Sequence, residues 1–178
     1  SIDKYVDNFS DILEKYQNKE YSEIFISNVK KVIEKENQII NSEKELPLSR
    51  KAALTLFRAM RYKDEYEVAR LHTSGNFAQT FLNENKNAKL EYYLAPPLFS
   101  KKDPDTGHLL KRKFGHSVYK IFKILSYFKF LRGTKLDIFG YTSERKKDRA
   151  LAQKTITTII KISEILNDNN YKKIIEFL

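Results

Sequence analysis

Residues 89–115 form the one stretch of this chain whose pattern is not helical. The stretch reads KLEYYLAPPLFSKKDPDTGHLLKRKFG, with apolar and aromatic residues ahead of two prolines. Pro96 and Pro97 remove two backbone donors and disfavour a helix at Ala95, the residue before them. Leu90–Leu94 is therefore predicted to be extended, and the rest of the chain has to fold around a small β element.

The second part of this stretch predicts a tight turn. Asp103–Gly107 reads DPDTG, in which the proline fixes one φ angle, the aspartates supply side-chain acceptors and the glycine allows a positive φ. A turn at this place lets the two flanking segments run antiparallel. Leu98–Lys102 and His108–Phe114 are therefore predicted to pair as a β-hairpin.

The segments on either side carry apolar residues at the spacing of amphipathic helices. Val118–Leu131 is the most hydrophobic of them and is predicted to be the core helix. The fold class is therefore predicted to be mainly α, a single helical domain over 1–178 with a small β-hairpin insertion around residues 90–114. The other expected helices are Ile2–Tyr16, Tyr21–Ile40, Ala52–Met60 after a cap at Ser49, Tyr62–Arg70, Phe77–Leu82, a long helix capped by Thr142 or Ser143 that runs to Leu166, and Tyr171–Leu178.

The helix expected at Tyr62–Arg70 holds three carboxylates, Asp64, Glu65 and Glu67, which invite a general acid-base interpretation. Three acids within four helical residues more often form a solvated face, and no neighbouring feature of the sequence separates their pKa values. We therefore expect no catalytic residue in this segment. Glu67 and Arg70 are expected to pair at i, i+3 on the helix surface.

The sequence lacks the residues that most cofactor and metal sites need. It has no cysteine, which excludes disulfides, thiolate zinc sites and cysteine-ligated iron-sulfur clusters. His72, His108 and His116 do not have the spacing of metal ligands and are expected to be surface or loop residues. The glycines form no phosphate-binding loop, and no serine lies in a nucleophile elbow. We therefore expect this chain by itself to hold no cofactor and no metal and to perform no catalysis.

The positive charge lies in the second half of the chain. Residues 1–85 hold 13 Lys and Arg against 14 Asp and Glu, whereas residues 86–178 hold 20 against 9, so the net charges are −1 and +11. A basic half is compatible with a free-standing binding module for nucleic acid or an acidic protein partner. A Lys-rich, solvated surface is the simpler interpretation, since no known nucleic-acid-binding motif is present.

Three blocks of the sequence resemble a known protein family. They are YKDEYEVARLHTSG at Tyr62–Gly75, the stretch at Lys89–Gly115, and LRGTKLDIFGYTSER at Leu131–Arg145. In this order and spacing they resemble the mostly helical C-terminal domain of indolepyruvate ferredoxin oxidoreductases of the long, fused bacterial type. The resemblance implies that this chain is a C-terminal fragment of a longer multidomain oxidoreductase.

The family's chemistry is implied only for that longer protein. The resemblance implies an enzyme that oxidatively decarboxylates aryl-pyruvates, a class of 2-oxoacids, with thiamine diphosphate, magnesium and iron-sulfur clusters, and passes the electrons to ferredoxin. The fragment would be an accessory or structural domain whose partners are the catalytic domains of the same chain. A cytoplasmic location without membrane contact is expected, because the sequence shows neither a signal-peptide layout nor a membrane-spanning run.

The charged residues of the first two blocks predict a contact between them. An acidic helix and a basic hairpin strand are expected to meet, with Arg112 in a buried or partly buried pair with a carboxylate. The alternative is that Pro96–Lys113 docks onto the catalytic domains, so that Arg112 serves that interface. The candidate interface or structural residues are Asp64, Glu65, Arg70, Pro96, Pro97, Lys111, Arg112 and Lys113.

Overall fold

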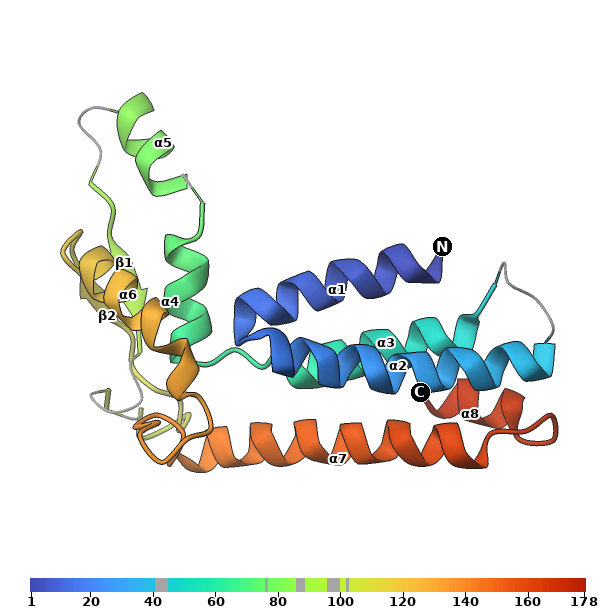
Figure 1. Ribbon diagram of the computed structural model, residues 1–178. Helices are drawn as coiled ribbons and strands as arrows, with labels where there is room; N and C mark the ends of the chain where they lie inside the picture. Colours follow the sequence, from blue (N-terminus) through green and yellow to red (C-terminus); the bar gives the residue numbers. More distant parts are fainter. Residues whose placement is uncertain (41–44, 76, 86–88, 96–99, 102) are drawn as a thin grey trace. The chain divides into compact units, whose positions relative to one another are not determined.

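The structure is a computed structural model that describes residues 1–40, 45–75, 77–85, 89–95, 100, 101 and 103–178. It is mainly helical with one two-stranded antiparallel pair among these residues, which confirms the predicted fold class (Figure 1). The chain divides into two compact units, one made of residues 1–62 and 143–178 and the other of residues 63–142. No helix in the described part is both long and apolar enough to cross a membrane.

The first unit is a bundle built from both ends of the chain. Its helices are α1 (Ile2–Tyr16), α2 (Lys19–Ile40), α3 (Pro47–Met60), α7 (Ser143–Ile165) and α8 (Tyr171–Phe177). Each of the longer helices presents a stripe of apolar residues to a shared core, as the periodicity predicts. Aromatic rings lie at its centre, where Phe9 of α1 stacks on Phe57 of α3 with 4.1 Å between the ring centroids.

A buried carboxylate joins three helices of this unit. Glu36 of α2 is fully buried and accepts hydrogen bonds from the amides of Leu48 and Ser49 at 2.9 and 2.7 Å. It also accepts from the hydroxyls of Ser49 and Tyr171, each at 2.6 Å. The carboxylate therefore supplies the acceptors that the first turn of α3 lacks, because Leu46 at the N-cap position offers none. The predicted cap at Ser49 is wrong, since the helix begins at Pro47 and Ser49 lies inside it.

In its described residues the second unit contains three helices, a 3₁₀ turn and the strand pair. Its elements are α4 (Glu65–Thr73), α5 (Phe77–Glu84), β1 (Tyr92–Leu94), β2 (Arg112–Phe114), α6 (Val118–Tyr127) and η1 (Phe128–Leu131). A small apolar cluster joins α4, α6 and the two strands. In it, Ala69 of α4 and Tyr92 of β1 pack with Val118 and Phe122 of α6. This cluster is much smaller than the core of the first unit, so α4, α6 and the strands rely on few apolar contacts.

The hairpin prediction is confirmed in its position and in the pairing next to the turn, and it is wrong in the partner of Arg112–Phe114. Tyr92 lies opposite Phe114 and Leu94 opposite Arg112, so the partner of the second strand is Tyr92–Leu94 rather than Leu98–Lys102. Residues 98, 99 and 102 lie outside the described residues. Near the turn, backbone bonds join Leu110 to Lys101 and Asp103 to His108, at 2.8 and 2.7 Å.

The predicted turn is confirmed at Asp103 and Gly107. The carboxylate of Asp103 accepts from the amides of Asp105 and Thr106 at 2.9 and 2.8 Å, the Asx-type bonding that the sequence indicates. Gly107 has a φ of 69°, a conformation that a glycine adopts without steric cost. These bonds to the ionised carboxylate also lower the pKa of Asp103, the amide of Thr106 contributing most.

The prediction that Val118–Leu131 is the core helix is wrong. Only Val118 and Phe122 of α6 are buried, whereas Ile121 and Ile124 are about 60% exposed, at 59% and 61%. The segment also changes from an α-helix to the 3₁₀ turn η1 at Phe128. The main core lies instead among α1, α2, α3 and α7 of the first unit. Hydrophobicity alone misplaced the core because this helix is apolar on both of its faces.

Candidate functional site

An ion pair buried in the second unit joins two of the sequence blocks that carry the family resemblance. Asp64 is the N-cap of α4, where its Oδ1 accepts from the amide of Glu67 at 2.8 Å. The guanidinium of Arg132 grips the same carboxylate with two hydrogen bonds, 2.5 Å from Nε to Oδ2 and 2.9 Å from Nη2 to Oδ1. The exposed fractions of the two side chains are 2% for Arg132 and 4% for Asp64. This bidentate geometry satisfies both oxygens in a setting where an unpaired charge is costly.

A second buried carboxylate organises the loop after η1. Asp137 accepts from the amides of Gly133 and Gly140, at 2.8 and 3.0 Å, and from the hydroxyl of Tyr66 at 3.2 Å. Burial first, and then the charge and hydrogen bond of Asp137, raise the pKa of Tyr66 well above its ordinary value. The hydroxyl therefore remains protonated and acts as a donor. The hydrogen bond from Tyr66 to Asp137 holds the loop after η1 against α4.

Glu67 and Arg70 form the pair that the sequence predicts. Their two hydrogen bonds measure 2.7 and 2.9 Å, and the side chains are 2% and 18% exposed. The interpretation of the acidic segment as a solvated face is wrong, since Asp64 and Glu67 are buried and Glu65 is half-buried. Asp64 pairs with Arg132, Glu67 pairs with Arg70, and Asp137 accepts from uncharged donors, so the cluster of Asp64, Glu67, Arg70, Arg132 and Asp137, hereafter the ionic cluster, is suited to holding structure.

The predicted pair between Arg112 and a carboxylate of the acidic helix is wrong. Arg112 and Lys111 are exposed, and the carboxylate of Asp64 is bound by Arg132 instead. Lys113 pairs with Glu91 on the neighbouring chain segment at 2.7 Å, which raises the pKa of its amine. Pro96 and Pro97 lie outside the described residues.

The hairpin does lie against α4, but through rings rather than charges. His72 of α4 stacks on Phe122 at a centroid distance of 5.1 Å and meets Tyr92 of β1 edge to face at 5.5 Å. Partial burial, and then the charge of Lys63, lower the pKa of His72, so the neutral ring is favoured in this contact. His72 is thus a packing residue. Among the described residues no group of three or more histidine, cysteine or acidic side chains could hold a metal ion.

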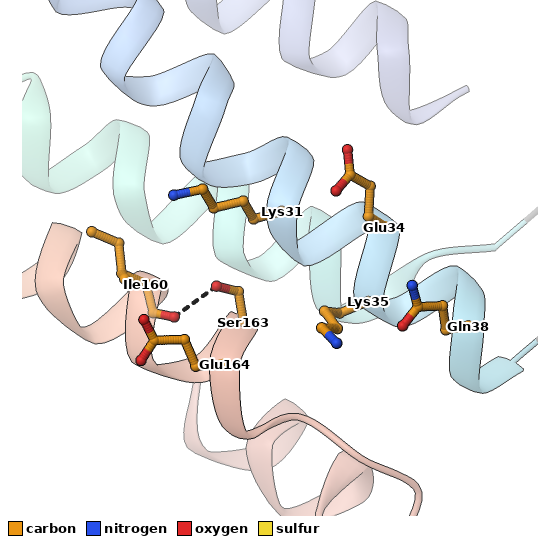
Figure 2. A pocket seen from close by; sticks show the side chains of 7 residues that line it. All are labelled: Lys31, Glu34, Lys35, Gln38, Ile160, Ser163 and Glu164. Atoms are coloured by element: carbon orange, nitrogen blue, oxygen red, sulfur yellow. Dashed lines mark hydrogen bonds between the residues drawn. The ribbon is translucent and has the colours of Figure 1, made fainter.

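An open groove lies between α2 and α7 of the first unit, with a volume of about 430 Å³ (Figure 2). Two lysines and two glutamates balance its charge. The hydroxyl of Ser163 donates to the carbonyl of Ile160 at 2.6 Å, as Figure 2 shows, so it is engaged with its own helix. The remaining wall carries no acid-base pair suited to catalysis. The groove is lined by Lys31, Glu34, Lys35, Gln38, Ile160, Ser163 and Glu164.

The outer side of α6 and η1 forms an exposed apolar face. It consists of five side chains that are between 41% and 73% exposed: Ile121, Ile124, Tyr127, Phe128 and Phe130. Ile121, Ile124 and Phe128 follow the spacing of one helix face, and the rings of Phe128 and Phe130 lie 6.0 Å apart. Clustered exposed apolar side chains of this size mark interaction surfaces in folded proteins. This surface, hereafter the apolar face, was missed at the sequence level because its residues were assigned to the core.

One comparison with known proteins is informative. A protein-family model described as a family of unknown function, DUF6537, matches residues 2–178. The match spans both compact units, and the chain belongs to that family. No curated protein and no solved structure matches the chain.

Proposed function

We propose that this member of DUF6537 is an accessory C-terminal domain of an indolepyruvate ferredoxin oxidoreductase-like enzyme. The parent enzyme would oxidatively decarboxylate aryl-pyruvates and pass electrons to ferredoxin. The domain would contribute surfaces and structural support to the catalytic domains of the same chain, and no catalytic group. The resemblance of three sequence blocks supports the parent, and the ionic cluster supports the structural role.

The ionic cluster is the observation that carries this role. Asp64 and Glu67 belong to the first of the resembling blocks, and Arg132 and Asp137 belong to the third. In the structure Arg132 binds Asp64 across the two blocks, and Asp137 of the third block accepts from Tyr66 of the first, both in a buried setting. The charged residues of the two blocks are therefore explained by the need to hold α4 against the loop after η1. This explanation requires no substrate.

The chain's own residues do not fit the cofactors of the parent enzyme. A chain without cysteine cannot ligate an iron-sulfur cluster through thiolates, and the described residues gather no set of magnesium ligands. Under this proposal, thiamine diphosphate, magnesium and the clusters are held by other domains, and the same domains meet ferredoxin. The 178-residue chain is then expected to be colourless and inactive.

The test uses the parent protein with and without residues 1–178. Aryl-pyruvate-dependent reduction of a viologen dye is measured for the parent, for the deletion variant and for this chain alone. We expect the parent to be active, this chain to be inactive, and the deletion to reduce activity or the yield of assembled protein. Activity in the chain alone, or full activity and assembly after the deletion, would reject the proposal. So would a parent that lacks a thiamine-binding segment and cluster cysteines.

A second candidate function is a basic binding module for nucleic acid. The exposed Lys111 and Arg112 lie on the hairpin with Tyr93, which is 62% exposed, and such a combination can contact phosphates and stack on a base. The structural proposal predicts weak DNA binding that disappears as salt rises, because a few Lys or Arg contacts to phosphate lose affinity as counterions compete. Salt-resistant, sequence-selective binding in a gel-shift assay would favour the module.

A further inference from the structure

Helix α6 is apolar on two faces, and only one of them is covered. Val118, Phe122 and the half-buried Leu125 face α4 and the hairpin, at i, i+4, i+7 spacing. Ile121 and Ile124 on the other face are exposed, and Tyr127 next to them is 73% exposed. An apolar helix face is normally buried against another element, and clustered apolar side chains left exposed mark interaction surfaces. The second face is therefore expected to be covered by something other than the described residues of the second unit.

The charged residues of the sequence segment that carries the apolar face are of one sign. Residues 106–136 contain no Asp or Glu and eight Lys or Arg. Lys120 and Lys123 are exposed on α6 beside the apolar side chains, and Lys135 is exposed after η1. The next acid in the sequence, Asp137, is buried and accepts hydrogen bonds from Gly133, Gly140 and Tyr66, so it does not offset these charges at the surface.

We propose that the apolar face docks onto a protein surface with an apolar centre and an acidic rim, located on the other domains of the parent chain. The proposal rests on the proposed function for the location of that partner. Opposite charges at the rim would orient the two surfaces, and the isoleucines and aromatic rings would form the desolvated centre. The residues that bind are Ile121, Ile124, Tyr127, Phe128 and Phe130, with Lys120 and Lys123 at the rim.

The charge pattern argues against a second copy as the occupant. In a two-fold symmetric dimer the same patch meets itself, so Lys120 and Lys123 would face the lysines of the partner copy with no acid between them. Like charges across an interface oppose association. A protein partner also fits better than a bilayer, because three of the five side chains are Tyr or Phe and these residues are enriched at the centres of protein interfaces.

Hydroxyl-radical footprinting of Tyr127 tests the proposal directly. The label is measured in the 178-residue chain and in the parent protein, with the fully buried Tyr16 as the internal reference for a protected ring. We expect Tyr127 to react readily in the chain and to lose its reactivity in the parent, down to the level of Tyr16. The double variant Ile121→Glu and Ile124→Glu should restore the reactivity of Tyr127 in the parent, because buried carboxylates would oppose docking.

Leu151→Glu is the matched control, since Leu151 is 58% exposed on α7 and lies outside the apolar face. It should leave Tyr127 protected. Equal reactivity of Tyr127 in the chain and the parent would overturn the proposal. So would protection already present in the chain, or a dimer of the chain that the double variant dissociates.

A bilayer is the remaining occupant to exclude. Flotation of the parent with vesicles of phosphatidylcholine and phosphatidylserine should show no binding that depends on Ile121 and Ile124. Binding that the double variant abolishes would overturn the protein partner. The footprint does not depend on the reaction that the parent catalyses. A protected Tyr127 in a parent without oxidoreductase activity would therefore reject the proposed function and support this inference. A reactive Tyr127 in an active parent would support the proposed function and reject this inference.

Discussion

Each compact unit contains a buried carboxylate that accepts hydrogen bonds at the N-terminus of a helix, but the two negative charges are stabilised in different ways. Glu36 in the first unit accepts four described hydrogen bonds, all from uncharged donors, namely two backbone amides and two hydroxyls. Asp64 in the second unit accepts from one backbone amide and from the guanidinium of Arg132. One carboxylate is thus solvated by dipoles, and the other is held by a counter-ion.

The difference predicts how each unit fails. When one member of a buried ion pair is removed, the other charge stays behind without compensation, which costs more than the loss of any single neutral donor. Glu36 has its bonds distributed over α3 and α8, so the loss of one donor leaves three. Asp64 depends mainly on one side chain. Substitutions should therefore be more damaging at Arg132 than at the partners of Glu36.

Arg132→Ala should give the largest effect. Its removal leaves Asp64 buried without a counter-ion, and the second unit should lose about 3–5 kcal/mol of stability. Denaturation in urea followed by far-ultraviolet circular dichroism measures the loss. Asp64→Asn combined with Arg132→Met is the control, because asparagine retains the N-cap acceptor without the charge. The double variant should be more stable than Arg132→Ala, and an equal or greater loss would show that the ion pair is not the cause.

Glu36→Gln should destabilise the first unit by a smaller amount. The amide keeps one acceptor oxygen but places an NH₂ group against donors from Leu48, Ser49 or Tyr171, so at least one buried donor loses its partner. The expected cost is about 1–3 kcal/mol. The same urea titration measures it, with the exposed Glu34→Gln on the same helix as the matched control. A loss as large as that of Arg132→Ala would contradict the comparison.

Tyr171→Phe should remove one donor and part of the alkaline sensitivity. Burial, and then the hydrogen bond and charge of Glu36, raise the pKa of Tyr171 above its ordinary value. Because the folded pKa is the higher one, the stabilisation is fully present below about pH 10, the pKa of an unfolded tyrosine, and is lost as the pH rises toward the folded pKa. The variant should be less stable near neutral pH and should lose less stability above about pH 10.

The comparison for this prediction is Tyr127→Phe, which changes an exposed ring of the apolar face. Urea titrations of both variants and of the unsubstituted chain, near neutral pH and in alkali, measure how the stability of each protein depends on pH. Tyr127→Phe should follow the unsubstituted chain at each pH. If Tyr171→Phe also follows it in alkali, the hydroxyl does not contribute to the pH dependence.

Local pattern predicted the helices and the turn because these depend on residues close in the sequence. The apolar spacing of α1 and the DPDTG turn are both satisfied by neighbours, and both predictions are confirmed. The partners of the buried carboxylates are distant. Asp64 and Arg132 are 68 positions apart, and Glu36 and Tyr171 are 135 apart. No local rule joins such residues.

A signal for Glu36 was nevertheless present. It falls on the same helix face as Val29 and Val32, so a charged residue interrupts an otherwise apolar stripe, and such a residue needs buried donors. For α6 the pattern was ambiguous, because a strongly apolar helix is equally consistent with a core and with a docking surface. Only the packing of the chain separates the two, and it covers one face of α6 and leaves the other exposed.

Arg112→Ala should give the smallest effect and separates the two roles considered for the hairpin. The side chain is exposed, and the acidic helix already pairs with the buried Arg132 and the half-buried Arg70, so the melting temperature of this chain should not change. Thermal melting of the chain and the activity of the parent are measured together. Unchanged melting with reduced parent activity would place Arg112 at an interface with other domains. Unchanged values in both assays would mean that Arg112 does not contribute to docking, so that docking would depend on the apolar face of α6 and η1. A lowered melting temperature would mean that Arg112 has a structural partner within the chain.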